Sequence, residues 1–118
     1  MNVNEYQLQA HDFADYERPV IVKGEKVTLI DYCYPALGLA EEAGEVAGKY
    51  AKAVRDCNGE IDSERKEAII KELGDVTWFV AELCTSLGVS LEEVMQKNID
   101  KLTSRKERNV LHGEGDNR

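Results

Sequence analysis

The sequence predicts an all-α protein with a four-helix bundle-like fold, and three observations support this prediction. Apolar residues recur at helical spacing over most of the 118 residues, the segments between these stretches are short, and strand-like patterns are almost absent. A chain of this length corresponds to one domain, 1–118. Because so small a bundle buries a limited core, we also expect it to assemble as an oligomer.

The first predicted helix, about 4–16, is followed by a segment of different character. Residues 17–31 contain Pro19, Gly24 and the β-branched run 20–22, which interrupt helical character. We therefore expect a loop insertion at 17–31, with a short extended piece inside it.

The second and third helices have clear start and stop signals. Pro35 suits the first turn of a helix that reaches about Arg55, and the turn residues 57–59 follow it. Asp62 or Ser63 can cap the third helix, which Gly88 ends.

The fourth predicted helix begins after Ser90, with Glu93 three residues later, which is the pattern of a capping box. Its apolar residues form a stripe that we expect to be buried: Leu91, Val94, Met95, Ile99 and Leu102. Residues 106–118 are read as a polar C-terminal tail.

Composition argues against several classes of protein. Fifteen Lys and Arg residues oppose 23 Asp and Glu, so the net charge of −8 disfavours binding to a nucleic acid polymer. No apolar run is long enough to cross a membrane, and the first residues do not resemble a signal peptide. Cys33, Cys57 and Cys84 are widely spaced, so we expect buried, unpaired thiols and a cytoplasmic protein.

Acidic residues three apart are the first candidates for a functional site, because this spacing places both on one helix face. Four such pairs occur, which is no more than this composition gives by chance, so the context of each pair decides. Glu42/Glu45 and Glu72/Asp75 lie in the most apolar stretches of their helices, where carboxylates are costly unless paired or bound to a cation.

Glycines accompany both of these pairs. Gly44 and Gly74 each stand directly before the second carboxylate, inside a helix, where glycine costs about 1 kcal/mol relative to alanine. We expect them to let the two helices approach closely, so that the acidic pairs face one another. Plain close packing is the alternative interpretation.

Four inward-facing carboxylates would form an oxygen-only site, which suits Mg²⁺ or Mn²⁺. A di-iron site would need a Glu-x-x-His motif, and neither His11 nor His112 provides one. Asn98, Lys101 and Arg105 share one helix face and could contact phosphates. Trp78 could stack on a base, although an aromatic residue beside an apolar stripe is more often part of a core.

These motifs, taken in order, resemble the MazG-like nucleoside triphosphate pyrophosphohydrolases. The resemblance rests on YPALGLAEEAGEVA at 34–47, KELGDV at 71–76 and NIDKL at 98–102, which follow the family pattern E-x-x-E, a gap, then E-x-x-D. It extends over about residues 4–118, including the closing residues 113–118, which look like those of small phage and bacterial relatives.

The resemblance implies an all-α homodimer or homotetramer that hydrolyses (deoxy)nucleoside triphosphates to the monophosphate and pyrophosphate. It implies a Mg²⁺-dependent attack at the α-phosphorus. By the same resemblance, the metal-binding and catalytic residues are Glu42, Glu45, Glu72 and Asp75, and the phosphate-binding residues are Asn98, Lys101 and Arg105. Glu41 departs from the family, which usually has a small residue there, and we expect it to be exposed or to support the site from outside.

Two other functions stay open at this point. The chain could bind a nucleotide or alarmone without cleaving it, or it could be a helical interaction module whose glycines serve only packing. Base and sugar preference are not readable, and only weak candidates can be named for a pocket wall: Trp78, Tyr6, His11 and Phe13.

Overall fold

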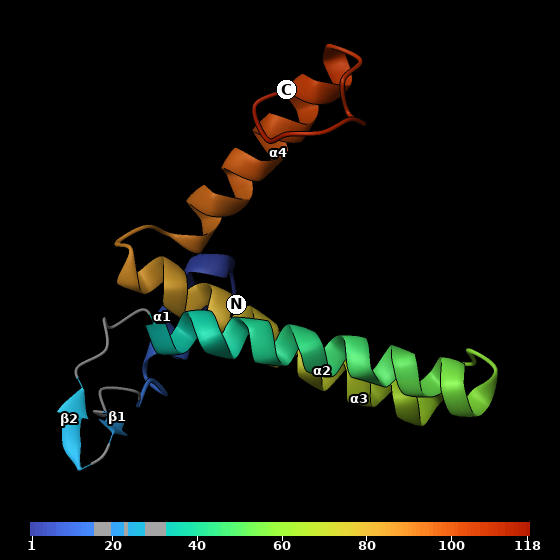
Figure 1. Ribbon diagram of the computed structural model, residues 1–118. Coiled ribbons are helices and arrows are strands. Elements are labelled where there is room, and N and C mark those ends of the chain that lie inside the picture. The colour runs from blue at the N-terminus through green and yellow to red at the C-terminus, as the bar shows by residue number, and fades with distance from the viewer. Residues whose placement is uncertain (16–19, 23, 28–32) are drawn as a thin grey trace.

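A computed structural model describes residues 1–15, 20–22, 24–27 and 33–118 of the chain. Its elements are α1 (Val3–His11), β1 (Val20–Val22), β2 (Glu25–Val27), α2 (Cys33–Cys57), α3 (Ser63–Ser86) and α4 (Leu91–Glu107) (Figure 1). The four helices confirm the all-α prediction. The extended piece expected within 17–31 is an antiparallel hairpin, in which Val20 pairs with Val27; residues 17–19, 23 and 28–31 of that segment lie outside the described residues.

The helix ends follow the signals in the sequence, with two differences. Asp62 caps α3 and Ser90 caps α4, and Gly88 adopts a left-handed φ of 70° just beyond α3. The Ser90 capping box is only half formed, because the Glu93 carboxylate pairs with Lys97 at 2.6 Å instead of returning to the cap.

The first helix is shorter than expected. It ends at His11 and not near residue 16, and it begins with a complete capping box between Asn2 and Glu5 that the sequence analysis did not identify. The Asn2 side chain accepts a bond from the Glu5 backbone N–H at 2.9 Å, and the Glu5 carboxylate accepts one from the Asn2 N–H at 2.8 Å.

Helices α2 and α3 form an antiparallel pair and make the most extensive contact in the structure (Figure 1). Their close approach occurs at Gly38, where an added Cβ would lie 2.2 Å from the Phe79 ring. The expectation for Gly44 and Gly74 is wrong, because a Cβ at either position would meet nothing within 4 Å. The glycine that brings these helices together is one turn before the acidic pair, not within it.

Helix α1 packs across α3 and covers the main core. The cluster consists of Ala10, Ala81, Cys84 and Leu91, with Trp78 against it. The Trp78 indole N–H donates to the Ala10 carbonyl at 3.0 Å, so this side chain fastens α1 to α3.

One side chain of α1 also fixes the junction between α3 and α4. The Gln7 amide donates to the Val89 carbonyl at 2.9 Å and to the Thr85 hydroxyl at 3.2 Å, and it accepts from the Leu91 backbone N–H at 2.6 Å. Gln7 therefore satisfies backbone groups at the junction, including one of the free N–H groups at the start of α4.

Beyond this junction α4 rises away from the α2–α3 pair (Figure 1). It contacts α1 and α3 but, among the described residues, makes no contact with α2. The expected buried stripe is therefore wrong except at Leu91, and the rest of it is exposed, with Met95 at 50% and Ile99 at 57%. The periodicity marks an apolar face correctly, but within one chain nothing described covers it.

The three cysteines are free, as expected, but only Cys84 is buried, whereas Cys57 is exposed. Among the described residues, we find no helix that combines the length and the apolar character needed to cross a bilayer.

The contact at Gly38 gives a prediction about stability. Gly38→Ala should destabilise the protein despite the better helix propensity of alanine, because overpacking against Phe79 costs about 1–3 kcal/mol against a gain of about 1 kcal/mol. Gly48→Ala is the matched control, since a Cβ there meets nothing within 4 Å, and it should leave stability unchanged or raise it. Thermal unfolding of both variants checks this, and equal unfolding midpoints for the two would contradict it.

Candidate active site

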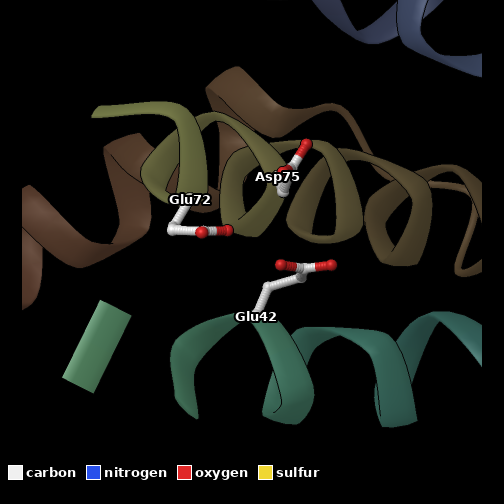
Figure 2. A group of neighbouring side chains, drawn as sticks. All are labelled: Glu42, Glu72 and Asp75. Carbon is white, nitrogen blue, oxygen red and sulfur yellow. The ribbon is translucent and has the colours of Figure 1, made fainter. Parts of the chain in front are cut away.

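Three of the four predicted carboxylates converge between α2 and α3. Each of Glu42, Glu72 and Asp75 offers an oxygen atom, and these three atoms lie within 4.8 Å of one another. Figure 2 shows Glu42 pointing from α2 towards the two side chains of α3. Carboxylates from both acidic pairs therefore do face one another, as the sequence analysis expected.

The contact between Gly38 and Phe79 explains this arrangement. Glu42 lies four residues after Gly38, and Asp75 lies four residues before Phe79, so each carboxylate is one turn from the contact on the same helix face. Because the helices are antiparallel, one turn along α2 corresponds to one turn back along α3, and the two carboxylates meet.

The cluster carries an excess of negative charge. The pKa of Glu42 is raised, because burial disfavours its charged form and because the negative charges of Asp75, Glu41, Glu72 and Glu45 lie nearby. A divalent cation would reverse this penalty, since it would convert mutual repulsion into shared attraction.

Lys49 partly neutralises the cluster. Its Nζ atom lies 2.9 Å from a carboxylate oxygen of Glu72, and both side chains are partly buried. The hydrogen bond to Glu72 is the main reason that the pKa of Lys49 is raised. Lys49 stands one turn after Glu45 on α2, but the carboxylate that it contacts, Glu72, is on α3.

Glu45 and Glu41 lie at the edge of the cluster. Glu45 is exposed and is not among the three converging carboxylates, although its charge contributes to the raised pKa values of Glu42 and Lys49. Glu41 is exposed, and it acts on Glu42 through its charge.

The donor set fits a hard divalent cation. All three converging groups offer carboxylate oxygens, which Mg²⁺ and Mn²⁺ prefer, and they come from helices whose spacing is fixed by packing. The raised pKa of Glu42 is a second sign that the arrangement is unfavourable without a positive partner.

The residues suggested for a pocket wall are placed on α1, on α3 and just beyond α1. Burial, and after it the nearby charge of Asp75, raises the pKa of Tyr6. The Trp78 indole N–H donates to the Ala10 carbonyl, and Phe13 is exposed. His11 contacts a residue that the sequence analysis overlooked: its Nδ1 atom lies 3.1 Å from Glu82, whose side chain is completely buried.

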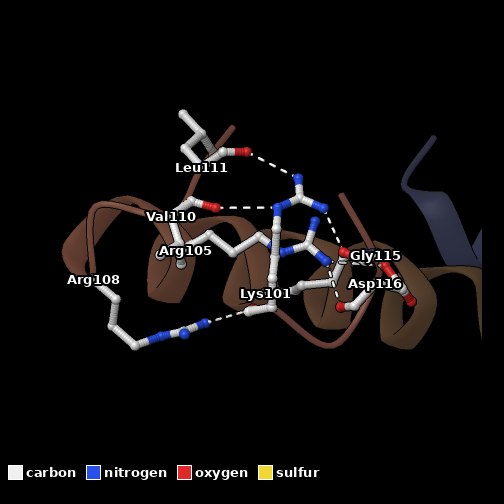
Figure 3. Close-up of polar contacts among 8 residues, drawn as sticks. Lys101, Arg105, Arg108, Val110, Leu111, Gly115 and Asp116 are labelled. Atoms are coloured by element: carbon white, nitrogen blue, oxygen red, sulfur yellow. Dashed lines mark hydrogen bonds and ion pairs between the residues drawn. The ribbon is translucent and has the colours of Figure 1, made fainter. Parts of the chain in front are cut away.

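The predicted phosphate-binding residues lie together on α4, but not beside the carboxylates of their own chain. Asn98 is exposed, while Lys101 and Arg105 contact Asp116 of the C-terminal tail at 3.1 and 3.0 Å (Figure 3). Beyond its start α4 leads away from the α2–α3 pair (Figure 1), and it has no described contact with α2, so the cationic and acidic groups are separate within one chain. Asp116 belongs to no periodic pattern in the sequence that could have identified it as a partner of these residues.

Comparison with known proteins identifies relatives. The model of the MazG nucleotide pyrophosphohydrolase domain matches residues 35–110. The "Gene 37 protein" of Mycobacterium phage L5 is 43% identical over 118 residues, covering the whole of both chains. The "Uncharacterized protein YvdC" of Bacillus subtilis strain 168 is 43% identical over 72 residues, which is 57% of this chain and 68% of that protein. No solved structure matches at a significant level.

The raised pKa of Glu42 predicts a stability change of definite sign. The folded protein binds a proton at Glu42 more readily than the unfolded chain does, so without metal this group's contribution to stability falls as the pH rises above its ordinary pKa of 4.5. At neutral pH, Glu42→Gln should therefore raise the unfolding temperature of the metal-free protein. We also expect Mg²⁺ to stabilise the native protein, and we expect this stabilisation to be lost in the same variant.

Thermal unfolding in chelator and in Mg²⁺, at mildly acidic and neutral pH, measures both effects. A metal-free variant that is less stable than the native protein at neutral pH would show that Glu42 is not under electrostatic strain.

Proposed function

This chain belongs to the MazG nucleotide pyrophosphohydrolase family, and from this premise we propose that it hydrolyses (deoxy)nucleoside triphosphates to the monophosphate and pyrophosphate, with Mg²⁺. The convergence of Glu42, Glu72 and Asp75 is the observation that carries the proposal. A cluster of carboxylates can bind a polyanionic substrate only through a cation, so the metal and the phosphate chain belong to one hypothesis. The substrate and the three free cysteines both favour the cytoplasm as the location.

In this proposal the roles of the side chains follow from their charges. Glu42, Glu72 and Asp75 hold the cation, and Glu45 completes the set from the edge. When bound, the cation supplies neutralisation of the triphosphate and stabilisation of the negative charge that develops during attack at the α-phosphorus. Glu42 or Glu45 accepts the proton of the attacking water.

Cations of the chain would bind the rest of the substrate. Asn98 and Lys101 contact the phosphates, and Lys101 steadies the departing pyrophosphate. Lys49 is available to the phosphate chain once Glu72 turns to the metal, since the ammonium then loses its present partner.

Product analysis with a panel of ribo- and deoxynucleoside triphosphates tests the reaction. We expect monophosphate and pyrophosphate in Mg²⁺, and no turnover in chelator. Glu42→Gln and Asp75→Asn should abolish turnover and leave the fold intact, while Glu64→Gln, which removes an exposed carboxylate elsewhere on α3, should not alter it.

Other outcomes would overturn parts of the proposal. Diphosphate and orthophosphate would mean attack at the γ-phosphorus. Binding of nucleotides without turnover would identify a non-catalytic nucleotide or alarmone-binding protein. Retained Mg²⁺-dependent activity in both carboxylate variants would remove these residues from the site.

We further propose that the protein is a homodimer or homotetramer. The support is apolar surface: Met95 and Ile99 are half exposed on α4, and Leu37 and Leu73 are exposed on the α2–α3 pair. A second copy that covers these faces would add the core that one chain lacks. It could also bring the cations of its α4 near the carboxylates of the first chain.

Substitution on α4 tests this assembly. Ile99→Asp should shift the protein towards monomer, because a charge replaces an apolar side chain in the proposed interface. Lys97→Asp introduces the same side chain about 200° around the helix from Ile99 and should not change the molecular mass of the assembly. Analytical ultracentrifugation measures both. A monomeric native protein, or equal masses for native protein and Ile99→Asp, would refute the proposed interface.

A further inference from the structure

The residues after α4 form a closed loop, which we call the C-terminal loop (109–118). The Arg118 guanidinium donates to the backbone carbonyls of Val110 at 3.2 Å, Leu111 at 3.0 Å and Gly115 (Figure 3). Arg108 of the preceding turn donates to the Arg118 carbonyl at 3.0 Å. A segment expected to be a polar tail is thus folded back and pinned by its own arginine.

Arg105 holds Asp116 of this loop by two contacts. Its Nη2 atom donates to the Asp116 backbone carbonyl and to the Asp116 carboxylate, the latter at 3.0 Å. The Arg105 side chain is only 7% exposed, and its Nε atom has no hydrogen-bond partner in the described structure. A phosphate therefore has little access to Arg105 while the loop is in place, and the main partner of this guanidinium is Asp116.

Asp116 in turn holds Lys101. The Lys101 Nζ atom lies 3.1 Å from the same carboxylate oxygen that Arg105 contacts. Hydrogen bonds from Lys101 and Arg105 lower the pKa of Asp116, so the carboxylate is ionised at neutral pH. An ammonium group has three N–H donors, and Asp116 uses one, so two remain for another acceptor. The Lys101 side chain is 39% exposed.

We propose that Asp116 is a positioning residue, which holds the Lys101 ammonium in place for a substrate phosphate, and that Arg105 supports Asp116 instead of contacting the phosphate itself. The inference rests on the proposed function, which assigns Lys101 to the phosphates.

The physical reason lies in the flexibility of lysine. A free lysine loses rotamer freedom when it binds a phosphate, whereas one already held by a carboxylate has lost most of it beforehand. The carboxylate does not cancel the site's attraction for anions, because the single negative charge of Asp116 is contacted by two cations, Lys101 and Arg105.

If Asp116 competed with phosphate instead of positioning Lys101, its removal would change anion binding in the opposite direction. If Asp116 only occupied Lys101 and Arg105 in place of a phosphate, then its removal would free both cations and strengthen anion binding. Positioning predicts weaker binding, so a single titration distinguishes the two.

The experiment titrates inorganic pyrophosphate, in excess Mg²⁺, into the full chain by calorimetry. Asp116→Asn should weaken binding by roughly three- to tenfold, the effect expected for one side chain that is no longer pre-positioned. Asp116→Glu should restore part of the loss. Glu114→Gln, which removes a carboxylate of the same loop that makes no ion pair in the described structure, is the matched control and should bind as the native protein does.

A double-mutant cycle separates positioning from general damage. Lys101→Met should weaken binding, and adding Asp116→Asn to it should weaken binding no further, because Asp116 acts through Lys101. A merely structural role would lower the unfolding temperature and weaken both backgrounds equally.

Unchanged or tighter binding by Asp116→Asn would overturn the inference, as would independent effects in the cycle or a native protein that does not bind pyrophosphate. Failure of the proposed function is distinguishable, since it would leave pyrophosphate binding and the coupling intact while no triphosphate is hydrolysed.

Discussion

The close contact of α2 with α3 at Gly38 and Phe79 is the constraint on which the rest of the structure depends. Because an aromatic ring occupies the space of a missing side chain, it sets both the separation of the helices and their register. Carboxylates one turn away on each helix must then meet, whatever the electrostatic cost. The raised pKa of Glu42 records part of that cost, and the ion pair between Lys49 and Glu72 offsets part of it. The packing of α2 against α3 therefore gathers negative charges at one place, where a positive charge is stabilising.

Much of this could be predicted from the sequence, because it depends on local chemistry. Caps such as Asp62 and Ser90 and the left-handed Gly88 act within a few residues, and the acidic pairs are visible as spacing. Contacts between helices could not be predicted in the same way. Gly44 and Gly38 look alike in sequence, and only the opposite helix shows which one is filled by a ring.

The two parts of the candidate site differ in how they are held. The carboxylates lie on helices that pack along their length (Figure 1), whereas Lys101 lies on α4, which is held at its start through Leu91 and leads away from that pair. The C-terminal loop gives this outer part a local framework of its own, built from guanidinium groups and backbone carbonyls. In the sequence, residues 106–118 look like a polar tail because such contacts leave no periodic pattern.

The junction between α3 and α4, which Gln7 holds, sets the direction of α4, and a small tilt there displaces residues further along the helix by a larger distance. Lys101 lies ten residues beyond Leu91, or about 15 Å along the helix axis, so a tilt of roughly 10° at the junction would displace it by about 3 Å. The Gln7 side-chain amide of α1 forms hydrogen bonds on both sides of that junction, with the Val89 carbonyl and with the Leu91 N–H. Catalytic geometry is sensitive to displacements on the order of 1 Å. The position of Lys101, the lysine proposed to bind phosphate, is therefore set by the side chain of Gln7, which belongs to another helix.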